Sequence, residues 1–152
     1  MEKSFIPNLK LVMIGDVNTG KSAIFNRFRN NSFNNCYLST IGIDLLNRKM
    51  DINIKGKNFP VNLQIFDTSG QERFRSITKR YLIKTNIFII VYDLTNRNSF
   101  YKLGEWINII QENKEDYFLV IFGNKKDLEK ERVVSTEEGK DFAEKNNAPG
   151  FS

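Results

Sequence analysis

The sequence contains no histidine and only one cysteine, Cys36, among its 152 residues. Without histidine there is neither the commonest general base nor the commonest metal ligand, so Ser-His and Cys-His catalytic pairs are excluded. A single cysteine can form no disulfide within the chain and no structural zinc site, which favours a reducing, cytoplasmic setting. Any catalysis must therefore use other chemical groups.

Apolar runs of membrane-spanning length and secretion signals are also missing. The longest apolar run, around residues 87–92, is far shorter than the roughly 18 to 20 residues that cross a bilayer. Residues 1–10 have no signal-peptide core. With 40% hydrophobic and 27% charged residues, and only 3 prolines, the chain has the composition of a folded soluble protein. Its length suits one domain, which we expect to span residues 1–152.

The net charge of +5 is a weak indication of the kind of partner. Basic residues are scattered among acidic ones and form no long run. No recognised nucleic-acid-binding module is present in the sequence, so we expect no nucleic acid partner.

Short apolar strands alternate with amphipathic helices along the chain. Strands are expected at residues 9–14, 43–54, 61–66, 87–93 and 118–123, and helices at residues 21–31, 100–110 and 136–145. The second and third strands are joined around residues 55–58, which predicts a β-hairpin. The fold class is therefore α/β, with a mostly parallel sheet, one antiparallel hairpin strand and helices on both faces. Ligands bind such sheets at the carboxyl ends of the strands.

Residues 15–22, with the sequence GDVNTGKS, match the pattern GxxxxGK[ST] and stand between a predicted strand and a predicted helix. In such a loop, backbone N–H groups surround phosphate oxygens and the helix dipole adds positive potential. Lys21 would neutralise the β- and γ-phosphates, and the Ser22 hydroxyl would ligate Mg²⁺. The alternative is a glycine-bearing turn with a helix-capping serine.

Residues 124–127, with the sequence Asn124-Lys125-Lys126-Asp127, follow the last clear strand. A carboxylate at this edge of the sheet can accept hydrogen bonds from N1–H and the exocyclic amine of guanine, whereas adenine would leave it unpaired. The segment therefore favours GTP over ATP when it accompanies a phosphate-binding loop. On its own it would more often be a solvated turn.

Residues 67–72 end the strand that begins at residue 61. A carboxylate there, Asp67, can hold Mg²⁺ through a water molecule, and Gly70 lets a backbone N–H approach the γ-phosphate. Gln71 can orient the attacking water. Thr40, in the polar loop before the hairpin, can offer Mg²⁺ a second hydroxyl. An ordinary polar turn and a strand-initiating threonine are the alternatives for these two segments.

These motifs and their order resemble the small GTPases of the Ras superfamily, and within it the Rab branch most. The similarity runs from about residue 9 to residue 149. The Rab-like segments are Ile41-Gly42-Ile43-Asp44, Leu63-Gln64-Ile65-Phe66, Gln71-Glu72-Arg73-Phe74-Arg75-Ser76-Ile77 and Tyr92-Asp93-Leu94-Thr95, of which the heptapeptide after Gly70 is the most specific.

The resemblance implies a P-loop NTPase G domain that binds Mg²⁺ and GTP or GDP and is a monomer. Phe33 would lie edge-on against the guanine, Tyr37 and Thr40 would belong to the first switch loop, and residues 67–80 would form the second. GTP orders both switches in such proteins, and hydrolysis releases them. Exchange factors, GTPase-activating proteins and effectors would distinguish the ordered from the released switch loops. The resemblance implies that this switching serves vesicle and protein transport.

The expected site residues fall into three groups. Lys21 and Gln71 are expected to be catalytic, and Ser22, Thr40 and Asp67 to hold the metal. The expected nucleotide-binding residues are Gly15, Asp16, Val17, Asn18, Thr19, Gly20, Lys21, Ser22, Ala23, Phe33, Tyr37, Thr40, Asp67, Gly70, Asn124, Lys125 and Asp127.

Two departures from the family pattern qualify these expectations. Val17 stands where the family has a small or polar residue, and its branched side chain could crowd the attacking water, so we expect slow hydrolysis. Residues 150–152 stand where the family pattern enters its last strand, its last base-contacting loop and its last helix. We expect these three to be lacking, with reduced stability or nucleotide retention.

No C-terminal cysteine is present, so attachment to endomembranes would need a lipidated tail, and we expect a cytoplasmic protein.

Two hypotheses of different classes remain. The first is a Rab-like GTPase that hydrolyses GTP slowly and acts as a switch. The second is a non-catalytic or truncated G-domain interaction module with impaired hydrolysis or nucleotide binding, which Val17 and the expected lack of the last elements favour. Turnover of GTP, stimulated by an activating protein, separates them.

Overall fold

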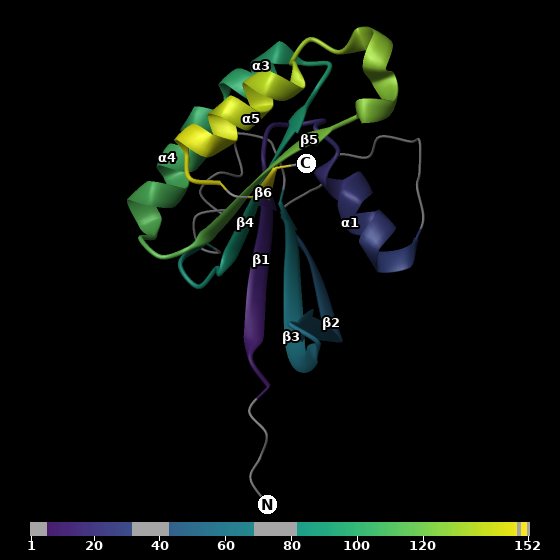
Figure 1. The fold of residues 1–152 in the computed structure, drawn as a ribbon, viewed down its shortest axis with the longest axis vertical. Helices are drawn as coiled ribbons and strands as arrows, with labels where there is room; N and C mark the ends of the chain where they lie inside the picture. Colours follow the sequence, from purple (N-terminus) through teal and green to yellow (C-terminus); the bar gives the residue numbers. More distant parts are fainter. Residues whose placement is uncertain (1–5, 32–42, 69–81, 149, 152) are drawn as a thin grey trace, which may run out of the picture.

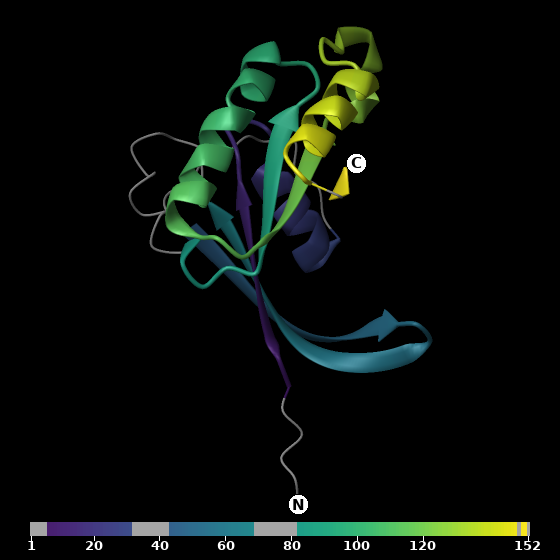
Figure 2. The same cartoon turned by 60° about the vertical axis from the view of Figure 1, so that its left-hand side comes forward.

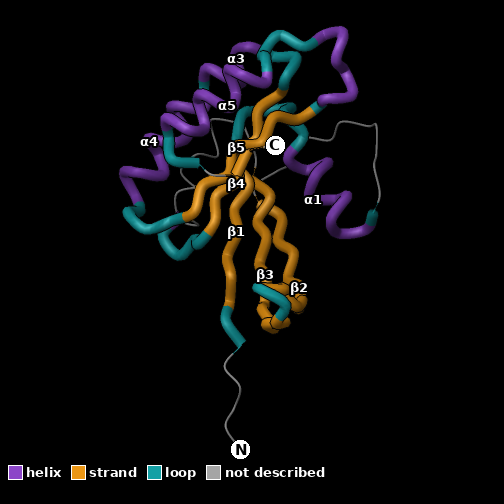
Figure 3. Tube along the Cα trace, viewed as in Figure 1, coloured by secondary structure: helices purple, strands orange, loops and turns teal. Residues whose placement is uncertain are grey.

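A computed structural model describes residues 6–31, 43–68 and 82–148 and the backbone of residues 150–151. One sheet runs through this part of the chain, in the strand order β2-β3-β1-β4-β5-β6. The strands are β1 (Asn8–Ile14), β2 (Ile43–Ile54), β3 (Lys57–Thr68), β4 (Ile87–Asp93), β5 (Phe118–Asn124) and β6 (Gly150–Phe151). β2 is antiparallel to β3, and every other pair is parallel (Figures 1 and 3).

Helices cover both faces of this sheet, as the sequence predicts. They are α1 (Lys21–Asn30), α3 (Arg97–Tyr101), α4 (Leu103–Asn113), the 3₁₀ helix η2 (Lys126–Glu131) and α5 (Thr136–Lys145). Figure 1 shows α3, α4 and α5 on one side of the sheet and α1 on the other. No helix in the described ranges is long and apolar enough to cross a membrane.

The two cores follow from the alternation of side chains along a strand. In β1, Val12 and Ile14 face the larger core, which α3, α4 and α5 complete with residues such as Trp106 and Ile110. Met13 faces the other way, into a smaller cluster. Phe25 of α1 and Ile65 of β3 pack with it, and Leu11, Leu46 and Leu63 surround that cluster. β1 is therefore buried on both sides, which its continuous apolar sequence predicts.

The hairpin is longer than the sequence predicts. β3 begins at Lys57 instead of residue 61, because the turn needs only Lys55 and Gly56, which both have positive φ (50° and 81°). Such two-residue turns match the twist of the flanking strands, so pairing continues up to them. Figure 2 shows the paired strands β2 and β3 bending away from the rest of the sheet.

Two further elements differ from expectation. A final strand, expected to be lacking, is present as the two-residue β6, which pairs with Val120 and Ile121 of β5. The helix expected around residues 100–110 is divided at Lys102 into α3 and α4. Asn96 caps α3 by accepting hydrogen bonds from the backbone N–H groups of Asn98 and Ser99, so α3 starts before the predicted helix.

Candidate functional site

The chemistry-bearing segments meet at one edge of the sheet, where the parallel strands end. The loop of residues 15–20 follows β1, Asp67 lies near the end of β3, Asp93 ends β4 and Asn124 ends β5. Because β3, β1, β4 and β5 are neighbours in that order, their carboxyl ends bring these residues together.

The shape of the loop after β1 depends on glycine at two positions. Gly15 has φ +140°, and a Cβ there would lie 2.2 Å from the backbone oxygen of Val91 in β4. Gly20 has φ +94°, and a Cβ there would lie 2.2 Å from the Nδ2 atom of Asn124. Asn18 adopts φ 62°, a left-handed conformation that asparagine tolerates. The loop therefore lies close against β4 and the end of β5 at two points where any side chain would collide.

Lys21, the first residue of α1, is held inside this loop. Its Nζ donates hydrogen bonds to the backbone oxygens of Gly15 (3.1 Å) and Asp16 (2.7 Å), and the residue is only 5% exposed. Burial lowers the pKa of Lys21 to about 8, against the opposing attraction of Asp67 and Asp16. Within the described ranges no carboxylate lies at ion-pair distance from this ammonium group. A buried cation of this kind is suited to bind an anion.

Ser22 and Asp67 form a pair of oxygen donors beside Lys21. The Ser22 hydroxyl donates a hydrogen bond of 2.5 Å to Asp67 Oδ2. Asp67 is 2% exposed, and burial raises its pKa although the bonds and charges of Ser22 and Lys21 oppose this. Its Oδ1 atom is buried and accepts no hydrogen bond from the described residues. A hydroxyl next to a carboxylate with an unused oxygen is a donor set that fits Mg²⁺, a hard cation with oxygen ligands.

The segment after β5 is tied to the loop and to β4. Asn124 Nδ2 donates to the backbone oxygen of Thr19 (2.9 Å), whose side chain is buried. Lys125, with φ 67°, places its Nζ 2.7 Å from Asp93 Oδ2. Asp127 is exposed in η2. Asn124 and Lys125 thus connect the end of β5 to the loop and to β4, whereas the Asp127 side chain faces solvent at the same edge of the sheet.

Asp93, Thr95 and Lys102 contact residues of this site but have no role in the sequence-based expectations. Burial would raise the pKa of Asp93, but hydrogen bonds from Lys125 and Thr95 hold it below its usual value. Lys102, at the junction of α3 and α4, lies 3.0 Å from Asp16 Oδ2. The position of Asp93 at a strand end was a usable sequence signal, whereas nothing in the sequence pairs Lys102 with Asp16.

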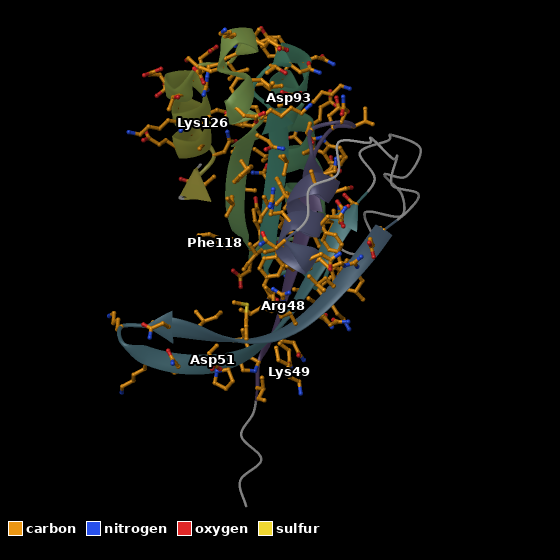
Figure 4. All side chains as sticks on the ribbon, turned by 90° about the vertical axis from the view of Figure 1, so that its right-hand side faces the viewer. Arg48, Lys49, Asp51, Asp93, Phe118 and Lys126 are labelled. Carbon is orange, nitrogen blue, oxygen red and sulfur yellow. The ribbon has the colours of Figure 1, made fainter. Side chains whose placement is uncertain are left out.

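The expected site residues divide into those that the structure brings together and those outside its described ranges. Val17 is 40% exposed on the loop, and Ala23 lies in the first turn of α1. Residues 15–23, Asp67, Asn124, Lys125 and Asp127 all lie at the carboxyl edge of the sheet. The predictions for Phe33, Tyr37, Thr40, Gly70 and Gln71 fall outside the described residues. In Figure 4, Asp93 and Lys126 mark this end of the molecule, away from Arg48 and Lys49 of β2.

In the comparison with known protein families, the Ras family model matches residues 10–152. The matched range includes the loop with Lys21, the Ser22–Asp67 pair and the segment 124–127. Ras-family proteins are small GTPase-type nucleotide-binding switches that bind GTP or GDP together with Mg²⁺. The chain belongs to the Ras family.

Proposed function

We propose that this protein is a Rab-like GTPase that binds Mg²⁺ with GTP or GDP, hydrolyses GTP slowly and acts as a switch in vesicle or protein transport. The observation that carries the proposal is the buried ammonium group of Lys21, next to the Ser22–Asp67 oxygen pair, at the start of α1. A desolvated cation, a helix N-terminus and two hard oxygen donors together match a polyphosphate with a divalent cation.

In this proposal the chain contributes positioning and charge, which phosphoryl transfer mainly requires. The backbone N–H groups of residues 15–20 surround the β-phosphate, and Lys21 turns its Nζ from the loop carbonyls toward the β- and γ-phosphate oxygens. Ser22, Asp67 and Thr40 would hold Mg²⁺, which neutralises charge developing on the phosphates when bound. Gln71 orients the attacking water, and the backbone N–H of Gly70 meets the γ-phosphate.

Base selection would rest on Asp127, whose exposed carboxylate can accept two hydrogen bonds from guanine. Asn124 and Lys125 support the proposal because their contacts hold the end of β5 against the phosphate-binding loop, through Thr19, and against the end of β4, through Asp93. Phe33 and Tyr37, which lie outside the described residues, would complete the nucleotide site in this proposal. Adenine would leave the Asp127 carboxylate without partners, so ATP is the poorer ligand.

The partners in this proposal are exchange factors, GTPase-activating proteins and effectors that contact the two switch loops. The Rab-like heptapeptide at residues 71–77 lies in the second of them and supports assignment to this branch. A monomer in the cytoplasm or at the cytosolic face of endomembranes is the expected state.

The first test is to purify the protein with Mg²⁺ present, denature it and identify the released nucleotide by chromatography. Near-stoichiometric guanine nucleotide is the expected result. A folded, monodisperse sample with no nucleotide would contradict the proposal. The matched variant Gln71→Leu should release more GTP relative to GDP than the parent, because water positioning is lost while binding is kept.

The second candidate is a non-catalytic interaction module, which the 40% exposed Val17 on the loop favours. A branched side chain at this position could prevent the water or an activating arginine from reaching the γ-phosphate. Single-turnover hydrolysis with and without a GTPase-activating protein separates the candidates. Retained guanine nucleotide with no hydrolysis in either condition would select the interaction module.

A further inference from the structure

The far end of α1 carries an open hollow of about 700 Å³. The last two turns of α1, Asn31 and Arg48 of β2 line it. Three guanidinium groups border it, those of Arg27, Arg29 and Arg48. Its lining residues on α1 begin at Ile24, about 5 Å along the helix from Lys21, and reach the end of the helix, about 14 Å from Lys21. None of its lining residues is among the expected nucleotide-binding residues, and the inference does not depend on the function proposed above.

Contacts with α1 hold these guanidinium groups in place. Arg48 lies over the Phe28 ring, 4.6 Å from its centroid, and donates a hydrogen bond to the backbone oxygen of Arg29 (3.3 Å). Arg27 donates to the backbone oxygen of Asn31 (3.3 Å). These bonds satisfy carbonyl groups at the negative end of the helix dipole. The arginines are therefore fixed by the fold before any partner arrives.

Positive charge around the hollow exceeds negative charge. Asp44 is paired with Arg29, with 3.1 Å between Oδ1 and Nη2. Neither Arg27 nor Arg48 has a carboxylate at ion-pair distance in the described ranges. A guanidinium group has five N–H donors; in the described contacts Arg27 uses only its Nη1 atom, toward the backbone and side-chain oxygens of Asn31, and Arg48 uses only its Nη2 atom. Two oriented cations with unused donors are therefore available to an anion.

The hollow also has an apolar component. Phe28 is 37% exposed beside the arginine stems, and Ile24 contributes a partly buried aliphatic side chain. A simple phosphate ion would use the charges and leave this apolar surface uncovered. A ligand with carboxylates and an adjacent apolar side chain would use both, since guanidinium groups bind carboxylates in forked geometry.

We propose that this hollow is a docking site for an acidic segment of a partner protein, in which at least two carboxylates flank an apolar side chain. The carboxylates pair with Arg27 and Arg48, and the apolar side chain covers Phe28 and Ile24. The site would let a partner bind without touching the nucleotide.

The chain offers a matched control for this proposal on the same strand. Lys49 follows Arg48 in β2, as both labels in Figure 4 show, and it pairs with Asn62 of β3. Successive side chains of a strand point to opposite faces, so Lys49 lies on the face of the hairpin opposite Arg48. Lys49→Gln removes one positive charge, as Arg48→Gln does, but it leaves the hollow unchanged.

The experiment is a selection of displayed random 12-residue peptides on the purified protein as isolated. Peptides that also bind the Arg27→Gln/Arg48→Gln variant are removed. We expect enriched peptides to carry two or more acidic residues around an apolar one. Fluorescence anisotropy should show affinity reduced about tenfold or more by Arg48→Gln or Arg27→Gln, as for loss of charge-assisted bonds. Lys49→Gln should change it less than about twofold, as for a peripheral charge.

Arg27→Gln keeps the test decisive if Arg48→Gln unfolds the end of α1. The absence of enriched peptides, enrichment without acidic residues, or equal losses with Lys49→Gln would each overturn the proposal. Two further measurements test binding of the protein to vesicles that contain phosphatidylserine and to inorganic phosphate alone. Arginine-dependent binding to either of these, without peptide binding, would assign the hollow to a membrane or a free anion and reject a protein partner.

Discussion

Lys102 Nζ lies 3.0 Å from Asp16 Oδ2, although 86 positions separate the two residues in the sequence. The Asp16 side chain is 11% exposed, so its carboxylate is largely withdrawn from water inside the phosphate-binding loop. Lys102 stands where α3 ends and α4 begins. The ion pair therefore ties the helical corner after β4 to the loop and neutralises a negative charge next to the expected phosphates.

Lys102→Met should weaken nucleotide retention. Removing one partner of a mostly buried pair leaves the other charge uncompensated, and Asp16 would then repel the phosphates. We expect GDP to dissociate roughly five- to tenfold faster, corresponding to about 1 kcal/mol, as measured with a fluorescent GDP analogue. Lys140→Met is the control, because Lys140 pairs with Glu144 at 3.9 Å with both side chains about two-thirds exposed. Equal rates for Lys102→Met and the parent would show that the pair does not position the loop.

The two loop glycines should respond differently to alanine. At Gly15 the added Cβ meets the backbone oxygen of Val91, which cannot rotate away, so we expect a loss of stability of several kcal/mol. At Gly20, where φ is +94°, alanine is strained as well, but its Cβ meets the Asn124 side chain, which can move, so we expect a smaller loss of stability together with loss of the Asn124–Thr19 bond and of nucleotide affinity. Urea denaturation and GDP binding separate these outcomes.

Gly104→Ala in α4 is the control for these variants. No atom lies within 4 Å of a Cβ built at Gly104, and alanine favours helix by about 0.5 to 1 kcal/mol over glycine. This variant should therefore be slightly more stable than the parent. If Gly15→Ala proved as stable as Gly104→Ala, the conclusion that the loop lies too close to β4 for a side chain at position 15 would be wrong.

The sequence predicted the parts of the site that depend on local pattern. The loop of residues 15–22 was identifiable because it lies between an apolar strand and an amphipathic helix, and α5 occurs at residues 136–145 as expected. Ser135 and Glu138 form a capping box at its start, a signal written in adjacent residues. A capping box is formed by residues three positions apart, so it can be predicted from the sequence without knowing how the strands are arranged in the sheet.

Asp67→Asn should remove the response of nucleotide binding to Mg²⁺. An amide oxygen can still accept the bond from Ser22, but it offers the cation no negative charge. In the parent, EDTA should speed GDP release at least about tenfold, because metal-bridged phosphate contacts are lost. In the variant, release should be fast with or without EDTA. A variant that still responded fully to EDTA would exclude Asp67 from the metal site.

The same substitution should stabilise the metal-free protein. Burial raises the pKa of Asp67 above the unfolded value of 3.8, so the folded state binds the proton more tightly than the unfolded state. Stability therefore falls as the pH rises from 3.8 through the folded pKa, and the cost of the buried carboxylate persists above it. Melting in EDTA across this range should show the parent losing stability relative to Asp67→Asn as the pH rises.

Val17→Ser should speed GTP hydrolysis if the branched side chain crowds the reaction. Val17 is 40% exposed on the loop, so the smaller residue removes bulk without disturbing the core. We expect single-turnover hydrolysis to rise about tenfold or more, with the larger effect in the presence of a GTPase-activating protein. Val17→Ile is the matched variant that keeps the bulk. A rate unchanged by Val17→Ser in both conditions would remove Val17 as the cause of slow hydrolysis.

Contacts between distant segments could not be predicted from the sequence. The 3.0 Å contact between Lys102 and Asp16 and the 2.7 Å contact between Lys125 and Asp93 depend on the order of β1, β4 and β5 in the sheet. Periodicity predicts that strands exist but not which strands are neighbours. The division between α3 and α4 was missed for a similar reason, because apolar spacing continues across Lys102.

The buried Lys21 should make the stability of the nucleotide-free protein depend on alkaline pH. Its pKa is about 8 in the fold, against 10.5 in the unfolded chain, because burial disfavours the ammonium form. Between these values the unfolded state binds more protons, so stability should rise as the pH increases from about 8 to 10.5. Below pH 8 the cost of burying the charge is fully present. The complete gain corresponds to about 3 kcal/mol at 1.36 kcal/mol per pKa unit.

The difference in stability between the parent and Lys21→Met isolates this titration, because all other groups titrate equally in both proteins. Urea denaturation of the nucleotide-free proteins from pH 7 to pH 10.5 should show the parent gaining stability relative to the variant. Bound GDP should abolish the gain, since phosphate contacts keep Lys21 charged across this range. A difference that stayed flat with pH would mean that the ammonium group is fully solvated. Lys21 would then not be a buried cation awaiting phosphate, and the main support for the nucleotide site would be lost.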